Sequence, residues 1–349
     1  MSKRGKANGI LVHLITTGAI LAVATLAMAT GGEKHELPPP QTAPVVANEE
    51  QLPSTEIISH SRSFFAAPPF MVAEEVYGKI VKGGDPSFFL VSLQSRDGFA
   101  QGHIPGAVNI PFPEISEPPA LARLPHDKTI VLTCDDGHRS AAATLYLTQL
   151  GYRAAMLGMG LSHWNGAAAK IAMPYPGSAG FPVSSENVTT TATYPLPELT
   201  APSGDAQETI TARTAAVLHS GRSLVIDGRE IYEQAVKKGD PGYFLVSLQR
   251  PEDYAKGHVP GAINIPYTEL TQPDNLKKLP PDQKIILICY IGHYAGAGAL
   301  FLNQLGYQAY DMRFGTLGWN DTTDGLGPVD KKAFLVGLGK SLALPIVKN

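Results

Sequence analysis

The feature of this sequence that most constrains its fold is an internal repeat with a constant offset of 155 residues. Both copies contain a Gly-His-x-Pro-Gly-Ala turn, which starts at Gly102 in the first copy and at Gly257 in the second. Further matches keep the offset without a gap: FLVSLQ at 89–94 and 244–249, QLGY at 149–152 and 304–307, and Trp-Asn at 164–165 and 319–320. A match of this length indicates duplication of a whole domain, so we expect two copies of one fold.

Each copy alternates between strand-like and helix-like segments. Short apolar runs predict buried strands at 88–93, 130–133, 244–248 and 285–288. Amphipathic spacing predicts helices at 72–81, 140–150, 229–236 and 295–305. Strands separated by helices indicate a parallel sheet with helices on both faces, so the sequence predicts the α/β class with a mainly parallel sheet in each copy.

Proline-rich segments mark the boundaries of the two copies. Residues 30–70 and 174–208 are rich in Pro, Ser and Thr, which is typical of extended tethers. The chain of 349 residues is long enough for two domains with their own cores. We therefore expect a leader at 1–29, a disordered tether at 30–70, a first domain at 71–173, a linker at 174–208, a second domain at 209–330 and a C-terminal tail at 331–349.

The leader has the pattern of an export signal. Lys3, Arg4 and Lys6 precede an apolar run at 10–29, which ends in Ala-Met-Ala. The pattern predicts an exported, periplasmic protein whose signal peptide is removed. The alternative is an uncleaved anchor in the inner membrane, because about 20 apolar residues can span a bilayer.

Charge and cysteine count exclude several classes of function. The 28 basic and 31 acidic residues give a net charge of -3, so no basic surface is expected for a nucleic acid. The 2 cysteines are too few for a disulfide scaffold or a cysteine-based metal cluster. We expect no metal, no cofactor and no nucleic-acid partner, and each cysteine needs an explanation of its own.

Each cysteine, Cys134 and Cys289, ends an apolar strand and opens a short loop that leads into a helix. At the carboxyl end of a parallel strand, such a sulfur faces backbone N–H groups and the positive end of the helix. These surroundings favour the thiolate and commonly lower a cysteine pKa to about 3.5 to 7.5. The same amides could hold a persulfide anion. The candidate substrate-binding residues are Asp135, Asp136, Gly137, His138 and Arg139 in the first loop and Tyr290, Ile291, Gly292, His293 and Tyr294 in the second.

The segment 254–266, YAKGHVPGAINIP, together with the strand, cysteine loop and helix that follow it, resembles the signature of the rhodanese family. The closing Gly-x-x-x-Trp-Asn at 315–320 fits the same family, and the resemblance covers residues 71–170 and 226–325. It implies two rhodanese-like domains, catalysis by Cys289 and Cys134, and ping-pong sulfur transfer through a cysteine persulfide. Family members that transfer sulfur have six-residue cysteine loops, whereas the related phosphatases have one residue more, so phosphatase activity is disfavoured.

Several residues depart from the family pattern. The first central strand of the family usually reads Asp-Val-Arg, whereas 92–94 and 247–249 both read Ser-Leu-Gln, without a charged pair to brace the cysteine loop. Asp135 and Asp136 should oppose a thiolate at Cys134 and repel thiosulfate. Tandem members usually keep a cysteine only in the second domain, while this chain has both. We therefore expect a persulfide, polysulfide or protein donor rather than thiosulfate, and sulfur relay between the two sites is an open alternative.

Other residues have structural alternatives. His138 and His293 could move protons or orient substrate, or they could only contact solvent. Arg139 could bind a substrate oxyanion, or only offset the acidic loop. His103 and His258 lie in the Gly-His-x-Pro-Gly turns and are expected to be structural. A disulfide between the two cysteines is a further alternative.

The sequence thus predicts a sulfurtransferase that moves sulfane sulfur from a thiosulfate, persulfide or polysulfide donor to a thiol or another thiophilic acceptor. The alternative is a sulfur-binding or docking module without turnover, which would serve an exported redox system such as one for chalcogen oxyanions. Its partners would then include a redox protein. A membrane is a partner only if the leader is retained.

Overall fold

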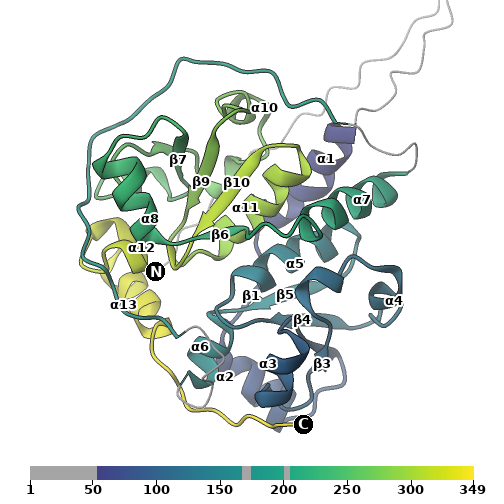
Figure 1. Ribbon diagram of the computed structural model, residues 1–349. Helices are drawn as coiled ribbons and strands as arrows, with labels where there is room; N and C mark the ends of the chain where they lie inside the picture. Colours follow the sequence, from purple (N-terminus) through teal and green to yellow (C-terminus); the bar gives the residue numbers. More distant parts are fainter. Residues whose placement is uncertain (1–52, 167–173, 200–204) are drawn as a thin grey trace, which may run out of the picture. The chain divides into compact units, whose positions relative to one another are not determined.

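The computed structural model describes residues 53–166, 174–199 and 205–349, and in this part the two copies of the repeat form two five-stranded sheets (Figure 1). The leader predicted at 1–29 lies outside the described residues. Among the residues described, no helix is both long enough and apolar enough to cross a bilayer.

Both sheets are entirely parallel and have the same topology. The first has the order β1-β5-β4-β2-β3 and the second the order β6-β10-β9-β7-β8. The strands of the first sheet are β1 (Phe70–Met71), β2 (Phe88–Ser92), β3 (Val108–Asn109), β4 (Thr129–Thr133) and β5 (Ala154–Leu157). Those of the second are β6 (Val225–Ile226), β7 (Tyr243–Ser247), β8 (Ile263–Asn264), β9 (Lys284–Ile288) and β10 (Gln308–Met312). The predicted α/β class with mainly parallel sheets is confirmed.

Helices cover both faces of each sheet (Figure 1). Those of the first half are α1 (Pro53–Ala66), α2 (Ala73–Val76), η1 (Tyr77–Lys82), α3 (Arg96–Gln101), η2 (Phe112–Glu114), α4 (Pro118–Leu121), α5 (His138–Gln149) and α6 (Gly160–Asn165). Those of the second are α7 (Ala206–Leu218), α8 (Gly228–Ile231), η3 (Tyr232–Lys237), α9 (Pro251–Tyr254), η4 (Tyr267–Glu269), α10 (Pro273–Leu276), α11 (His293–Gln304), α12 (Gly315–Trp319), η5 (Asp324–Leu326) and α13 (Val329–Leu338). The central strands β4 and β9 are apolar and almost wholly buried, as expected for parallel strands covered on both faces.

The helix α1 corrects the described part, from residue 53 on, of the tether predicted at 30–70, and residues 30–52 lie outside the described residues. Its residues Ile57, Ile58, Phe64 and Phe65 are buried, and their spacing places them on one side of the helix. The helix α7 has the matching place in the second half, directly before the first strand. In each half, a helix thus precedes the first strand of the sheet.

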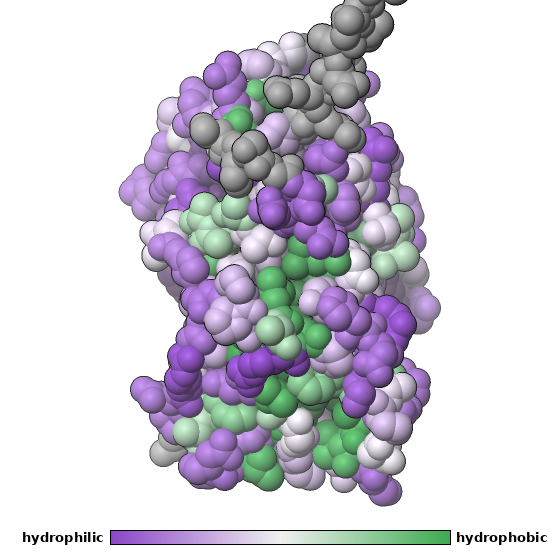
Figure 2. Space-filling model, turned by 90° about the vertical axis from the view of Figure 1, so that its right-hand side faces the viewer, coloured by the Kyte–Doolittle hydropathy of each residue, from purple (hydrophilic) through white to green (hydrophobic). Residues whose placement is uncertain are grey.

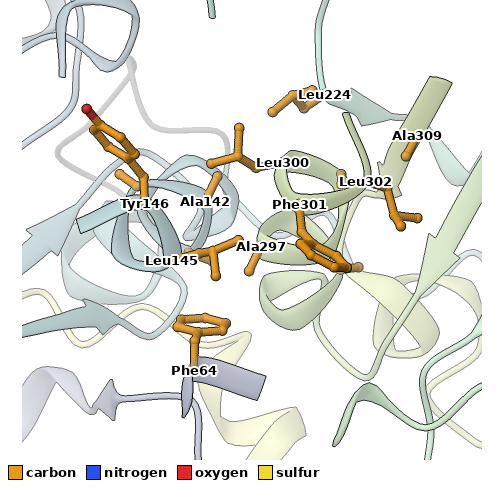
Figure 3. Close-up of a cluster of buried hydrophobic side chains, with 14 of the residues drawn as sticks. Phe64, Ala142, Leu145, Tyr146, Leu224, Ala297, Leu300, Phe301, Leu302 and Ala309 are labelled. Atoms are coloured by element: carbon orange, nitrogen blue, oxygen red, sulfur yellow. The ribbon is translucent and has the colours of Figure 1, made fainter. Parts of the chain in front are cut away.

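The helices α5 and α11 pack against each other and join the two halves (Figure 1). Figure 3 shows Leu145 of α5, Ala297 and Phe301 of α11 and Phe64 of α1 in the shared apolar cluster. The side chains of Gln149 and Gln304, which are 155 positions apart, exchange two hydrogen bonds of 2.8 and 2.9 Å. Equivalent residues that bond each other indicate that the halves are related by an approximate twofold axis. On the face shown in Figure 2, apolar side chains gather in a band across the middle.

The segment expected to be a linker is fixed to the second domain, although most of it lacks regular secondary structure. The Phe181 amide donates to the Trp319 carbonyl at 3.0 Å, and the Trp319 indole donates to the Pro182 carbonyl at 2.7 Å. Ser184 then pairs with His258 in an antiparallel bridge. The linker therefore acts as a strap across the domain that follows it.

The C-terminal segment makes the same contacts with the first domain. The Leu344 amide donates to the Trp164 carbonyl at 2.9 Å, and the Trp164 indole donates to the Pro345 carbonyl at 2.8 Å. Val347 forms an antiparallel bridge with His103. The tail predicted at 331–349 is thus partly helical, within α13, and partly a strap. The segment that follows each domain's last strand and helix is thus bound to the other domain.

Candidate active site

The cysteine loops have the same backbone in both domains. Cys134 follows β4 and Cys289 follows β9, and each loop reaches its helix through a glycine with a left-handed backbone. Gly137 has φ 93° and Gly292 has φ 91°, values that side chains other than glycine rarely adopt. These glycines turn successive amides toward the sulfur.

Main-chain amides converge on both sulfur atoms. The Cys134 Sγ accepts hydrogen bonds from the amides of Gly137 at 3.1 Å and Ser140 at 3.4 Å. The Cys289 Sγ accepts one from the Gly292 amide at 3.2 Å. The predicted placement of the sulfurs among backbone N–H groups is confirmed.

The predicted lowering of the cysteine pKa is wrong for this state of the protein. Burial raises the pKa of Cys134 to about 11, with further increases from Asp136 and Asp135. Burial also raises the pKa of Cys289 to about 11, with a smaller increase from Asp311. The amides act in the expected direction, but desolvation of the thiolate outweighs them. Both cysteines are free, so the disulfide alternative is also wrong.

The two loops meet through their histidines, which the sequence did not indicate. A Cβ atom on Gly137 would lie 2.2 Å from His293 Nε2, and one on Gly292 would lie 2.0 Å from His138 Cε1. The two imidazole centroids are 5.8 Å apart. Each glycine thus leaves the space that the other domain's histidine fills. We call these four residues the glycine–histidine lock.

The amides that hold the histidines come from strained turns. Met159 and Phe314 both have positive φ, 53° and 57°. The Met159 amide donates to His293 Nε2 at 2.8 Å, and the Phe314 amide donates to His138 Nε2 at 3.3 Å. A non-glycine residue in this region costs about 1 to 3 kcal/mol, and such residues gather at functional sites.

The other ring nitrogens differ between the two histidines. His138 Nδ1 lies 2.5 Å from the Asp311 carboxylate. Burial opposes a charged ring, but Asp311 raises the pKa of His138, and burial raises the pKa of Asp311 itself to about 6. Because the Nε2 atom accepts a hydrogen bond, the ring proton lies on Nδ1, between the ring and the carboxylate.

His293 lacks such a partner. Its Nδ1 is buried and has no hydrogen-bonding partner among the described residues. The residue 155 positions before Asp311 is Met156, which offers no carboxylate. Burial and, to a smaller extent, the nearby His138 lower the pKa of His293 to about 3. This ring is therefore neutral at neutral pH, with its proton on Nδ1.

An ion pair between the two domains lies next to Cys134. Arg313, from the second domain, bonds the Asp136 carboxylate. Burial opposes ionisation of that carboxyl, but His138 and Arg313 lower the pKa of Asp136. The Cys134 sulfur contacts the Asp136 carboxylate at 3.8 Å and the Ser140 hydroxyl at 3.7 Å.

A cavity of about 540 Å³ lies beside this loop, yet Cys134 is not among its lining residues. Its walls include His138 and the exposed Arg139 from the first domain and Asp311 from the second. The half-buried Asp135 does not line it either, and burial raises the pKa of Asp135 to about 6. Of the first loop's candidate residues, His138 and Arg139 line this cavity.

The cavity of the second domain does reach its cysteine. It has a volume of about 390 Å³. It is lined by Cys289, Tyr290, Ile291, His293 and Tyr294 of the loop, by Phe70 of the first domain, by Arg250 and Tyr267, and by Lys331, Phe334 and Leu335 of α13. Four of the predicted loop residues thus lie around one cysteine, and Gly292 supplies the amide.

Two cations stand at this cavity, and both are held by one carboxylate. Arg250 and Lys331 lie 2.9 and 3.4 Å from Asp253. Tyr290 donates to Asp253 at 2.5 Å, and the Lys331 ammonium lies 3.6 Å from the centre of the Tyr290 ring. Lys331 and Arg250 were not predicted from the sequence, because nothing in the loop motif indicates α13 or the segment between β7 and α9.

An uncharged pair replaces the missing charges of the central strand. Ser247 donates to Gln249 at 2.7 Å, and the Gln249 amide donates to the Gly257 carbonyl at 3.0 Å and the Gly325 carbonyl at 2.6 Å. Ser92 and Gln94 repeat the first two bonds in the other domain. This pair braces the Gly-His turn rather than the cysteine loop.

The histidines of the Gly-His-x-Pro-Gly turns are structural, as predicted. His103 and His258 each place Nδ1 2.7 Å from a backbone carbonyl four residues earlier. Both rings are buried. Within the described residues, no group of three or more His, Cys, Asp or Glu side chains is arranged to hold a metal ion.

Together these features define a class: a tandem α/β protein with a six-residue cysteine loop at the carboxyl end of the central strand in each domain. A family model described as rhodanese-like domain matches residues 72–167 and 218–322. The chain belongs to the rhodanese-like domain family, as its motifs predicted.

Named relatives match one domain at a time. A sulfurtransferase of Allochromatium vinosum is 35% identical over 86 residues, which are 24% of this chain and 78% of the relative. A thiosulfate sulfurtransferase of Stutzerimonas stutzeri is 29% identical over 91 residues, 26% of this chain and 82% of the relative. These matches place the chain in a family of sulfurtransferases.

Two solved structures are also similar to parts of this chain. A rhodanese-related protein of Thermoplasma volcanium is 27% identical, with 27% of this chain and 86% of that chain covered and a TM-score of 0.24. A thiosulfate sulfurtransferase of Pseudomonas aeruginosa is 19% identical, with 74% of this chain and 45% of that chain covered and a TM-score of 0.31.

Proposed function

We propose that this protein is a sulfurtransferase that carries sulfane sulfur on Cys289 as a persulfide. The observation that carries the proposal is the cavity that Cys289 lines, where its sulfur accepts the Gly292 amide at 3.2 Å. An outer sulfur on Cys289 would enter a space next to main-chain N–H groups, which stabilise an anion. The named sulfurtransferases among the relatives support this function.

The transfer balances without an oxidant or a cofactor. The Cys289 thiol loses its proton to solvent, and the thiolate attacks the sulfane sulfur of the donor. A bond forms between the two sulfurs, and the bond that held the sulfane sulfur in the donor breaks. Its electron pair leaves on the donor, as a thiolate from an organic persulfide or as sulfite from thiosulfate. An acceptor thiolate then attacks the outer sulfur and releases the Cys289 thiolate.

The cavity favours an anionic donor with an apolar body. Arg250 and Lys331 supply positive charge, while Phe70, Tyr267 and Tyr294 supply apolar walls. Thiosulfate, named for the Stutzerimonas stutzeri relative, offers charge but no apolar part. We infer that an organic persulfide or polysulfide is the better donor, and that the acceptor is a thiol or another thiophile.

Cys134 is assigned a minor role in turnover. It does not line the neighbouring cavity, and Asp136 and Asp135 both oppose its thiolate. We therefore expect Cys134 to take up sulfur more slowly than Cys289 does.

A second function, a sulfur-binding module without turnover, is favoured by one observation. Burial raises the pKa of both thiols to about 11, so both are protonated at neutral pH. A module of this kind would take up sulfur slowly and pass it only to a docked redox protein.

We further propose, from the leader predicted at 1–29, that the protein acts in the periplasm, either free or anchored to the inner membrane.

Site-resolved mass spectrometry of the full chain tests the proposal. After incubation with polysulfide or thiosulfate, we expect the Cys289 peptide to gain one sulfur atom before the Cys134 peptide does. In a transfer assay to cyanide, Cys289→Ser should lower the rate by at least about a hundredfold. The matched Cys134→Ser variant should lower it by less than about twofold, since Cys289 supplies most of the turnover.

The two functions give different outcomes. Loading of Cys289 followed by release to cyanide or a small thiol supports the transferase. Loading without release to any small acceptor supports the module instead. No sulfur on Cys289 after exposure of the folded protein to either donor would refute both.

A further inference from the structure

A residue that lines the second cavity carries a buried hydrogen-bond donor that no described residue uses. His293 lines this cavity together with Cys289. Its Nε2 accepts the Met159 amide at 2.8 Å, so the proton of the neutral ring lies on Nδ1. That Nδ1 is buried and has no hydrogen-bonding partner in the described part of the chain. A buried, unsatisfied donor destabilises the folded protein, and such groups in native proteins call for an explanation.

The matched residue of the first domain shows that the feature is specific to the Cys289 site. His138 Nδ1 bonds Asp311 at 2.5 Å, whereas the position equivalent to Asp311 is Met156 in the first domain. The free donor thus lies beside the cysteine that lines a cavity. The Nδ1 of His138, which already bonds Asp311, lies beside a cavity that Cys134 does not line.

We propose that His293 is a substrate-contacting residue, whose Nδ1–H donates a hydrogen bond to the sulfur that Cys289 carries or to the anionic group of the donor. The proposal deepens the function proposed above and rests on it. No proton is transferred in this step, because the ring only stabilises negative charge on the terminal sulfur of the persulfide. The Gly292 amide donates to the adjacent sulfur, Cys289 Sγ, at 3.2 Å.

The first domain holds His293 in this state. The Met159 amide fixes the ring proton on Nδ1, and the missing side chain of Gly137 leaves room for the ring. Burial and the nearby His138 lower the pKa of His293 to about 3, so the ring stays neutral at neutral pH. The carbonyl of Ile291 favours the protonated ring without forming a hydrogen bond to Nδ1. The first domain therefore positions His293 in the site of the second domain.

Three substitutions separate hydrogen bonding from packing. His293→Asn keeps an amide N–H close to the position of Nδ1, while His293→Gln places its amide near the position of Nε2. His293→Ala keeps neither. We expect the rate of sulfur loading at Cys289, followed by mass spectrometry with polysulfide, to fall by about 10- to 100-fold in the Ala and Gln variants. The Asn variant should stay within about threefold of the wild type, since it retains the donor.

The outcomes are distinct. If Gln preserves loading and Asn does not, His293 acts only by filling the space at Gly137, and the proposal fails. It also fails if all three variants load at the wild-type rate, or if Asn loses as much as Ala. A wild-type protein that takes up no sulfur refutes the proposed function itself rather than the role of His293. Thermal unfolding of each variant shows whether the protein is folded.

A measurement on the wild type covers the case in which the variants do not fold. In protein labelled with nitrogen-15 at histidine, NMR reports which nitrogen of His293 carries the proton. We expect a protonated Nδ1 before loading, and a downfield shift of that proton once Cys289 carries sulfur. An unchanged signal, or a proton on Nε2, would overturn the proposal.

Discussion

The two cysteine sites have the same backbone but different surroundings. In both, a left-handed glycine turns an amide toward the sulfur, at 3.1 Å for Cys134 and 3.2 Å for Cys289. Around Cys289 the loop continues with tyrosine and isoleucine, and a cavity reaches the sulfur. Around Cys134 it continues with two aspartates, and the adjoining cavity does not reach the sulfur. The two sites thus share the amide that bonds the sulfur, but they differ in the flanking side chains and in whether the adjoining cavity reaches the sulfur.

The differences also cross the domain boundary. Arg313 of the second domain bonds Asp136 in the first, whereas its equivalent, Gly158, has no side chain to send back. Phe70 of the first domain lines the Cys289 cavity. Each site is thus completed by the other domain, so divergence in one copy changed the site in the other.

The largest effect is expected from a substitution that fills the space at one glycine of the glycine–histidine lock. A Cβ in Gly137→Ala would lie 2.2 Å from His293 Nε2, on a backbone with φ 93°. Together the clash and the left-handed backbone should lower the free energy of unfolding by about 3 kcal/mol. Urea unfolding measures the change.

The control for this variant is Gly106→Ala. Gly106 has φ 83° and no atom within 4 Å of the added carbon. Its loss should be about 1 kcal/mol, from the backbone alone. Equal losses in the two variants would show that the lock does not join the domains.

A smaller effect is expected from opening the Cys134 site with Arg313→Met. Without Arg313, the buried Asp136 carboxylate loses its ion pair, which should cost about 2 kcal/mol at pH 7, the low end for buried pairs because the Arg313 side chain is 23% exposed. The wild-type pKa of Asp136 is lowered, so its contribution is present above about pH 4 and is lost as the pH falls further. In the variant, Arg313 no longer opposes the effect of burial, so the pKa of Asp136 should be higher than in the wild type. Protonation of this carboxylate in the variant should then reduce the deficit as the pH falls from 7 to 4.

Unfolding of Asp136→Asn and of the double variant completes a thermodynamic cycle. The double variant should be more stable than Arg313→Met alone at pH 7, because it no longer buries an unpaired charge. A deficit in Arg313→Met that is the same at pH 7 and pH 4 would indicate lost packing rather than a lost ion pair.

Much of the fold could be read from the sequence because local patterns determine it. The repeat predicted two domains, and the apolar runs predicted β2, β4, β7 and β9 in place. The pattern in α1 was also readable, since Ile57, Ile58, Phe64 and Phe65 have helical spacing, but the surrounding prolines and polar residues masked it. Local signals of this kind carry no information about which segment each helix packs against.

The parts of the site that could not be predicted depend on how the domains meet. Comparing the copies at the offset of 155 shows Asp311 against Met156 and Arg313 against Gly158. Nothing in that comparison indicates that residues of one copy reach the loop of the other. The raised pKa of both cysteines also depends on burial, which follows from the packing of the whole protein.

The smallest effect tests whether loop charge alone makes the two sites unequal. Burial, with help from Asp136, raises the pKa of Asp135 to about 6, compared with about 3.9 in an unfolded chain. Between about pH 6 and pH 3.9, Asp135 binds a proton in the folded state but not in the unfolded state. The free energy of unfolding of the wild type therefore rises as the pH falls through this range. Asp135→Asn removes that titration. It should stabilise the protein by about 1 kcal/mol at pH 7, allowing for solvent screening, and by nearly nothing at pH 4.

The same variant should make Cys134 more reactive, because Asp135 is one of the charges that raise its pKa. We expect alkylation of Cys134 at pH 8 to become faster by about two- to threefold, while Cys289 is unchanged. The exposed Asp127→Asn is the control and should change neither rate. If Asp135→Asn leaves the alkylation of Cys134 as slow as before, the two sites differ in access to the sulfur rather than in charge. The next test would then be whether the ion pair between Arg313 and Asp136 limits that access.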